Sequence, residues 1–355
     1  MSQAGFGEFL QPPRAHGGPA GRGQIRTVPE DFVVREWLGF EADGEGEHWL
    51  LTVRKRGSNT LWVAKQLARM AQISPRDVGF AGLKDRHAVT EQSFTLPVRA
   101  TPTDWTGASG EGFEVVRATR HRRKLKRGAL RANDFAIVVR NFSGDSQALT
   151  QRLSAIATQG VPNYFGPQRF GADAGNVARA WQWFSGAIEP QDRIQRGFAL
   201  SAARAAIFNA VLAERVRQST WQRIQSGDLA NLDGSNSVFA VDAPDAVLNE
   251  RCERFDIHPT GPLWGRGALR SQDQIATLEQ SIAARYEVLS AGLVREGLEQ
   301  ERRALRIRVS QLEWSLNGAE LRLGFRLPRG AFATAVLHEL LEDAFSQPNP
   351  EAEEE

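Results

Sequence analysis

The sequence predicts an α+β fold in which a strand-rich domain is interrupted by a helix-rich one. Strand patterns dominate up to about residue 142, helix-forming segments dominate residues 145–303, and strand patterns return at 305–312 and 320–327. Strands that resume after a helical stretch indicate an insertion into a sheet domain. We therefore predict four parts: a discontinuous domain of residues 24–155 plus 305–345, an inserted domain of residues 160–304, an irregular arm at 1–23, and an acidic tail at 346–355.

The elements of the first part follow from local patterns. Residues 31–38 and 48–56 read as strands, and the glycine-rich link between them predicts an antiparallel hairpin. A helix is expected over 59–73, with Asn59 or Thr60 as its cap and Pro75 after its end. Further strands are expected at about 93–98, 113–120 and 134–142.

After residue 142 the remaining predicted elements are mainly helical. Helices are expected at 145–159, 173–185 and 199–218, one or two more within 271–303, and a last one at about 331–344. The glycine- and proline-rich arm and the tail "PNPEAEEE" are expected to lack regular structure.

The composition excludes several classes of protein. The chain has 355 residues, of which 41% are hydrophobic and 24% charged, as in a soluble protein with a sizeable core. A single cysteine permits no intrachain disulfide and fits a reducing compartment. We find no apolar segment of roughly 18 residues, no secretory signal and no metal-binding motif. The expectation is a cytoplasmic, monomeric protein without membrane or metal.

A basic segment at residues 117–131 contains eight Lys or Arg residues and no acid, although the net charge of the chain is only +2. A solvated face is one interpretation, but so many cations repel one another unless an anion is near. We predict that the segment binds nucleic acid through phosphate contacts, made by Arg122, Arg123, Lys124, Lys126 and Arg127. The stretch "VPNYFGPQRFG" (161–171) is either a base-stacking surface or a packed loop.

Asp85 lies among cations in "GFAGLKDRHAVTEQSF" (79–94). It is either a salt-bridge residue or a carboxylate that Lys84, Arg86 and His87 keep ionised for nucleophilic or general-base chemistry. No second acid lies beside it in "GLKDRH", which argues against a glycosidase-type pair.

Six motifs, in order along the chain, resemble those of the tRNA pseudouridine synthase D family. They are "PEDFVVRE", "GFAGLKDRHAVTEQ", "LRANDF", "VPNYFGPQRFG", "LSAARAAIFNAVLAERV" and "LPRGAFATAVLHEL", between residues 29 and 340. The resemblance implies a pseudouridine synthase catalytic domain, with a curved, mainly antiparallel sheet flanked by helices, and a family-specific helix-rich insertion. It also implies isomerisation of uridine 13 of tRNA without cofactor or metal.

The resemblance assigns roles to residues. Asp85 is the implied nucleophile, and attack on C1′, attack on C6 and a glycal route all stay open. Because a paired uridine is inaccessible, it must be flipped out of its stack. The implied substrate-binding residues are Phe32, Asn133, Phe135 and Phe332.

Two further residues are candidates for support of Asp85. Arg26 stands where family members carry Lys, and Lys84 is adjacent to Asp85. Phe135 stands where most other pseudouridine synthase families have Tyr. An RNA-binding or tRNA-folding module without catalysis is the alternative, whereas a small-molecule hydrolase leaves the basic segment unexplained.

Overall fold

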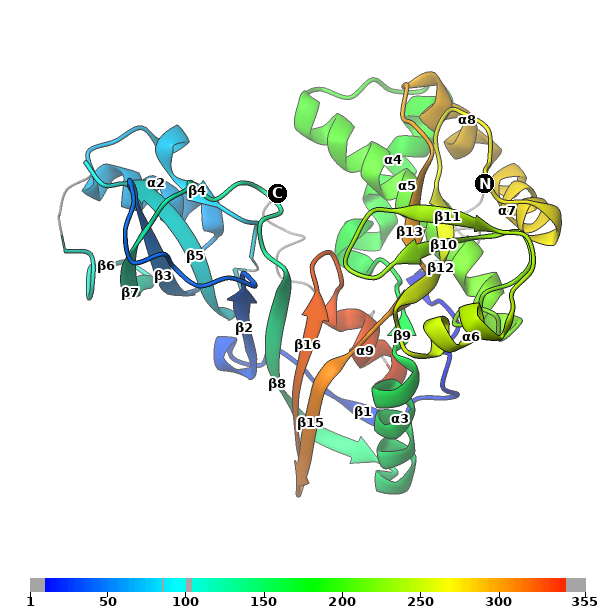
Figure 1. Cartoon of the computed structure of the whole chain (residues 1–355), viewed down its shortest axis with the longest axis horizontal. Coiled ribbons are helices and arrows are strands. Elements are labelled where there is room, and N and C mark those ends of the chain that lie inside the picture. The colour runs from blue at the N-terminus through cyan, green and yellow to red at the C-terminus, as the bar shows by residue number, and fades with distance from the viewer. Residues whose placement is uncertain (1–9, 85, 100–103, 343–355) are drawn as a thin grey trace. The chain divides into compact units, whose positions relative to one another are not determined.

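The computed structural model describes residues 10–84, 86–99 and 104–342. Contacts divide the chain into two compact units (Figure 1). The helical unit consists of Met1–Gly21, Gly144–Arg308 and Ala331–Glu355, and the sheet unit of Arg22–Ser143 and Val309–Gly330. Residues 144–155, 305–308 and 331–345 thus fall in the helical unit, although the sequence pattern grouped them with the sheet. The extent of the catalytic domain, residues 24–155 plus 305–345, stays a prediction.

The sheet unit is built on a 10-stranded sheet in the order β15-β16-β8-β2-β5-β3-β7-β6, with β1 beside β8 and β4 beside β5. The strands are β1 (Gly21–Gln24), β2 (Phe32–Trp37), β3 (His48–Arg56), β4 (Gly79–Phe80), β5 (Val89–Pro97), β6 (Ser109–Gly110), β7 (Phe113–His121), β8 (Ala132–Gly144), β15 (Ser310–Asn317) and β16 (Glu320–Pro328). The sheet is mainly antiparallel, and β2 pairs in parallel with β5. The predicted α+β class is confirmed.

The predicted hairpin of β2 and β3 is wrong, because β5 lies between these two strands. β3 pairs antiparallel with β5 from His48 to Arg56 and with β7 on its other edge. The link between β2 and β3 is long enough to let a third strand enter, unlike the two- to five-residue loops of tight hairpins.

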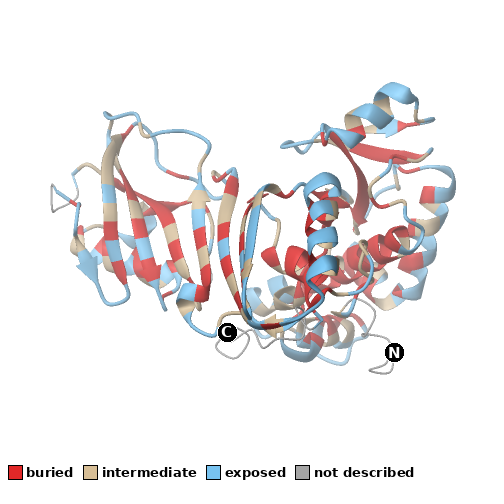
Figure 2. Ribbon diagram, turned by 90° about the horizontal axis from the view of Figure 1, so that it is seen from below, coloured by how far each residue is buried: buried red, intermediate tan, exposed pale blue. Residues whose placement is uncertain are grey.

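Helix α2 (Thr60–Met70) covers one face of this sheet. Asn59 Oδ1 caps the helix by accepting a hydrogen bond from Trp62 N at 2.8 Å. Val63 and Leu67 are buried in a cluster that includes Leu51 and Phe94 of β3 and β5. Figure 2 shows buried and exposed residues alternating along the strands, as a half-covered sheet requires. Short 3-10 turns precede β2 and β4, η2 (Pro29–Asp31) and η3 (Pro75–Asp77).

The helical unit is centred on α5 (Arg193–Arg217), which begins earlier than predicted because Asp192 caps Ile194 N and Gln195 N. The helix is long and apolar enough to cross a membrane, but 67% of its apolar window is buried in the unit's core. The other helices are α3 (Ser146–Gln159), α4 (Gly175–Phe184), α6 (Ala246–Glu253), α7 (Asp273–Arg285), α8 (Glu287–Arg295) and α9 (Ala333–Leu340), with the 3-10 turns η4 (Pro167–Arg169) and η5 (Ala172–Ala174).

The helical unit also contains strands that the sequence analysis missed. A four-stranded sheet has the order β11-β10-β12-β13, and β9 pairs with β14. These strands are short and separated by turns or by a helix, so they lack the long alternation that marks a strand in sequence. They are β9 (Val161–Pro162), β10 (Asp228–Leu232), β11 (Val238–Val241), β12 (Ile257–Leu263), β13 (Glu301–Ala304) and β14 (Arg306–Ile307).

The described part of the N-terminal arm is bound to α9. Arg14 donates to the carbonyl oxygens of His338 and Leu341 at 2.6 and 2.8 Å. The Glu339 carboxylate accepts from Ala15 N and His16 N at 3.0 and 3.1 Å. Burial raises the pKa of Glu339 to about 7 and lowers the pKa of His338 to about 4.

Candidate active site

Two neighbouring strands of the sheet unit bring three predicted residues to one face. In the antiparallel β2–β8 register, Phe32 stands opposite Ile137, Val34 opposite Phe135, and Glu36 opposite Asn133. Side chains of directly opposed residues lie on the same face of a sheet. Phe32 and Phe135 meet edge to face with 6.1 Å between ring centroids. The structure therefore places Phe32, Asn133 and Phe135 on one face of the sheet.

Arg26 lies over this face. Its guanidinium carbon is 4.2 Å from the centroid of the Phe32 ring, a cation–π contact. Its backbone has φ 58°, which is uncommon for a residue other than glycine. Arg26 is thus held next to a predicted substrate-binding residue.

Asn133 carries a buried acceptor. Within the described residues, its Oδ1 has no hydrogen-bond partner. Buried polar atoms are nearly always bonded in native proteins, so an exception calls for an explanation. One explanation is that Asn133 Oδ1 accepts a hydrogen bond from a bound ligand.

Asp85 lies outside the described residues, but the chain on either side of it is described. Lys84 Nζ is 2.6 Å from Glu36 Oε1, and their side chains are only 7% and 1% exposed. The second oxygen of Glu36 accepts from Ser93 N at 2.9 Å. The Lys84 ammonium is therefore paired with a buried acid on β2.

Polar residues of the sheet and of α2 hold the loop that leads to Asp85. Thr60 Oγ1 accepts from Lys84 N at 2.9 Å and donates to Gln92 Oε1, also at 2.9 Å. Gln92 Nε2 in turn donates to Gly82 O at 2.7 Å. The backbone on the N-terminal side of Asp85 is thus fixed by a bonded chain of side chains.

Lys55 is a functional candidate that the sequence analysis missed. It is 1% exposed, and Lys55 Nζ donates to Ser58 O at 2.7 Å and to Lys84 O at 3.3 Å. Lys84 O belongs to the peptide that precedes Asp85. The signal was present, because in β3 Lys55 follows Leu51 and Val53 at intervals of two and so faces the core with them.

The basic segment is joined to the same loop. Gly128 N donates to Ala81 O at 2.7 Å, and Leu125 N donates to Thr95 Oγ1 at 2.9 Å. The five predicted phosphate-binding side chains are exposed. The segment therefore presents accessible cations next to the loop that carries Asp85.

Not all five cations are equally available. Arg122 pairs with Glu45, Lys124 Nζ donates to Arg76 O at 2.6 Å, and the Arg127 guanidinium carbon lies 4.0 Å from the centroid of the Phe80 ring. Within the described part of the chain, Arg123 and Lys126 have neither a hydrogen bond nor an ion pair.

Phe332 belongs to the helical unit, where it is the N-cap residue of α9. Its ring is 6.2 Å from that of Phe165. Tyr164, Phe165 and Phe170 of the "VPNYFGPQRFG" stretch are at most 8% exposed and belong to the unit's core. The aromatic residues of this stretch therefore form a packed loop.

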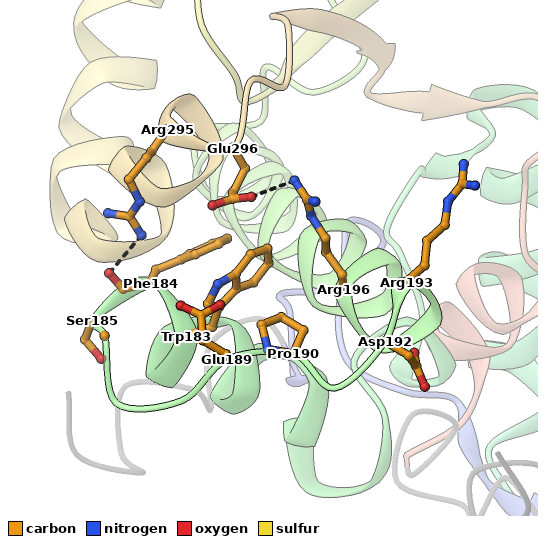
Figure 3. Close-up of a pocket in the computed structure, with 11 residues that line it drawn as sticks. Trp183, Phe184, Ser185, Glu189, Pro190, Asp192, Arg193, Arg196, Arg295 and Glu296 are labelled. Atoms are coloured by element: carbon orange, nitrogen blue, oxygen red, sulfur yellow. Dashed lines mark hydrogen bonds and ion pairs between the residues drawn. The ribbon is translucent and has the colours of Figure 1, made fainter.

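A separate cavity of about 810 Å³ lies in the helical unit (Figure 3). Arg196 pairs there with Glu296 at 2.8 Å, and Arg295 donates to Phe184 O at 3.0 Å. Its described lining contains none of the predicted site residues. Over the whole of the chain that the structure describes, no group of three His, Cys, Asp or Glu residues could hold a metal ion.

Comparisons with known proteins identify the family. The family model described as tRNA pseudouridine synthase D matches residues 15–179 and 181–340. The tRNA pseudouridine synthase D of Nitrosococcus oceani is 45% identical, covering 94% of this chain and 96% of its own, and that of Xanthomonas euvesicatoria is 48% identical, covering 92% and 94%.

A solved structure supports the fold. It is that of a tRNA pseudouridine synthase D from Methanosarcina mazei, which superposes with a TM-score of 0.73 at 21% identity and covers 97% of this chain and 98% of its own. The expected fold is therefore confirmed. The chain belongs to the tRNA pseudouridine synthase D family of isomerases.

Proposed function

We propose that this protein converts uridine 13 of tRNA into pseudouridine, with Asp85 as the nucleophile. The observation that carries the proposal is the shared sheet face of Phe32, Asn133 and Phe135. In the same unit, side chains of the sheet and of α2 hold the backbone that leads to Asp85. Family membership supports the activity.

The reaction is an isomerisation. The C1′–N1 bond of uridine breaks, the detached uracil turns, and a C1′–C5 bond forms, with no redox change and no net hydrolysis. An ionised carboxylate serves each of the three routes that stay open: addition to C1′, addition to C6, or assistance in loss of the C2′ proton. A fixed loop backbone would hold that carboxylate in place while the base turns.

The substrate base enters the site by leaving its stack, which costs a few kcal/mol. Phe32 and Phe135 provide apolar walls for it, and the family resemblance assigns Phe332 to substrate binding as well. Asn133 Oδ1 suits the N3–H donor of uracil, since it is a buried acceptor that no described residue bonds. Arg26, stacked on Phe32, adds positive charge beside the site.

The basic segment would hold the tRNA backbone. Its exposed cations flank the Asp85 loop, so binding there would direct the RNA toward the site and offset the cost of base flipping. A tRNA substrate also accords with the expected cytoplasmic location.

The test is replacement of the nucleophile. We expect Asp85→Ala to abolish pseudouridine formation, detected by carbodiimide-adduct primer extension at position 13, and to leave tRNA affinity within a few fold. Asp242→Asn, an exposed aspartate of the helical unit, is the control and should keep full activity. Undiminished product from Asp85→Ala would reject the assignment, and tRNA binding without product from the wild type would favour the RNA-binding alternative.

A further inference from the structure

Two arginines of the helical unit share one aromatic ring. The guanidinium carbons of Arg303 on β13 and Arg169 on η4 lie 4.2 and 5.4 Å from the centroid of the Phe165 ring. Like charges so placed repel each other, and burial makes that repulsion stronger than it would be in water. An arrangement of this kind is favourable when an anion is bound.

The charge of Arg169 has no counter-ion among the described residues. Its Nη1 donates to Ser201 Oγ at 2.8 Å, and its Nε is buried without a partner in the described part of the chain. Burial lowers the pKa of Arg169, and burial together with Arg169 lowers the pKa of Arg303 to about 9.

Two other arginines with buried side chains in the same unit are paired with acids. Arg215 lies 2.8 Å from Asp228 Oδ1, and Arg302 lies 2.7 Å from Glu279 Oε1. A third, Arg306, has no acid partner in the described part of the chain but donates to the carbonyl oxygens of Gln222 and Cys252. Among the described residues Arg169 has neither a carboxylate nor a carbonyl acceptor, only the Ser201 hydroxyl, so a bound anion would complete its interactions.

The N-terminus of α9 adjoins the same ring. Phe165 contacts Phe332, and no side chain caps the helix at Phe332. Thr334 Oγ1 is buried without a hydrogen-bond partner among the described residues, and a Cβ added at Gly166 would lie 2.6 Å from it. The first turn of α9 thus offers an uncapped positive end and a free hydroxyl beside the loop of Phe165 and Arg169.

We propose that Arg169, assisted by the charge of Arg303 and by the N-terminus of α9, binds one phosphate group of the tRNA backbone. A guanidinium and the N-terminus of a helix are both suited to phosphate oxygens. The site rests on the proposed function, because it would place that phosphate next to Phe332, which the family resemblance assigns to substrate binding.

The experiment pairs a protein change with a change in the RNA. Arg169→Gln is compared with wild type for binding of a tRNA stem-loop substrate in which one phosphate at a time is replaced by a neutral methylphosphonate. We expect Arg169→Gln to weaken binding about 10-fold and to lower the slope of log Kd against log salt by about 1. At one position, the methylphosphonate should weaken wild-type binding but have little effect on the variant.

Two further variants complete the design. Arg254 is an exposed arginine that follows α6. The control variant Arg254→Gln should bind each methylphosphonate-substituted RNA as the wild type does. Arg169→Lys keeps the charge but loses the planar guanidinium, so its affinity for the stem-loop should lie between those of wild type and Arg169→Gln. If Arg169→Gln has a lowered Tm, Arg169→Lys replaces it in the comparison with wild type.

The proposed phosphate site would be wrong if the effects of Arg169→Gln and of the methylphosphonate on binding free energy simply added at every position. It would also be wrong if Arg169→Gln left the slope of log Kd against log salt unchanged. Because wild-type pseudouridine formation is assayed on the same RNA, that result is distinguishable from failure of the proposed function.

Discussion

A lysine in the interior of a sheet has to be explained by what it bonds. Lys55 is almost fully buried, and removal of an ammonium from water is unfavourable unless it finds partners. Its Nζ donates to the carbonyl oxygens of Ser58, two residues after β3, and of Lys84, next to Asp85. We therefore interpret Lys55 as a positioning residue for the Asp85 loop.

Replacement of Lys55 tests this role. Lys55→Met keeps the length of the side chain but leaves two buried carbonyl groups without their donor, at about 1–3 kcal/mol of unfolding free energy. We expect kcat to fall at least 10-fold while the Kd for tRNA changes by no more than a few fold, measured by single-turnover kinetics and filter binding. Lys65→Met, on the exposed side of α2, is the control. A loss of stability with kcat unchanged would make Lys55 structural only.

The sequence predicted part of the site at this scale. The resemblance assigned Phe32, Asn133 and Phe135 to the substrate, and the strand register places them on one face. Glu36 and Lys55 were not singled out, although each follows buried apolar residues at intervals of two. What the sequence could not supply is which buried charge meets which, because Lys84 and Glu36 are brought together only by the fold.

Helix α9 contains two residues, His338 and Glu339, whose shifted pKa values make the stability of the protein change with pH in opposite directions. The folded-state pKa of Glu339 is about 7, above the ordinary 4.5, so its contribution to stability is present below pH 4.5 and lost as pH rises to 7. The folded-state pKa of His338 is about 4, below the ordinary 6.5, so its contribution is present above pH 6.5 and lost as pH falls to 4. Between these limits the two effects oppose each other.

Glu339→Gln should separate the two effects. The amide keeps an acceptor for the arm and cannot lose a proton, so only the contribution of His338 remains. We expect the unfolding free energy of the variant, relative to wild type, to rise between pH 4.5 and 7 by up to about 3 kcal/mol, measured by urea unfolding. Glu313→Gln, exposed on β15, should show no such rise. A flat difference for Glu339→Gln would contradict the assigned pKa.

Most elements were predicted, whereas their neighbours in the sheet were not. Helix α3 and strand β16 have nearly the predicted bounds, because capping residues and alternation are local signals. Strand order is not local: β5 entered between β2 and β3, and no turn pattern reveals that. The short strands of the helical unit pair with residues far along the chain, as β12 does with β13.

For the whole molecule, the distribution of charge matters more than the total. The net charge is only +2, yet the basic segment concentrates exposed cations beside the Asp85 loop. Of these cations, Arg123 and Lys126 have no hydrogen bond or ion pair to another described residue. They are therefore the cleanest probes of contact with RNA.

The double variant Arg123→Gln/Lys126→Gln should weaken tRNA binding and lower the slope of log Kd against log salt by about 2, since each phosphate contact contributes about 0.9. Titrations between low and moderate salt measure the slope. The pair Lys65→Gln/Arg69→Gln on α2, also exposed and in the same unit, is the matched control. Equal slopes for both double variants would show that the basic segment does not face the RNA.

The interleaving of the two units has a consequence for synthesis on the ribosome. The sheet unit is completed by β15 and β16, and the helical unit by α9, all from the last quarter of the chain. Domains usually fold one after another as they emerge. Here neither unit can close until translation is nearly finished, so nascent chains of this protein expose the edge of β8 that later pairs with β16, together with an open helical core. A chaperone would be needed most during this stage of elongation.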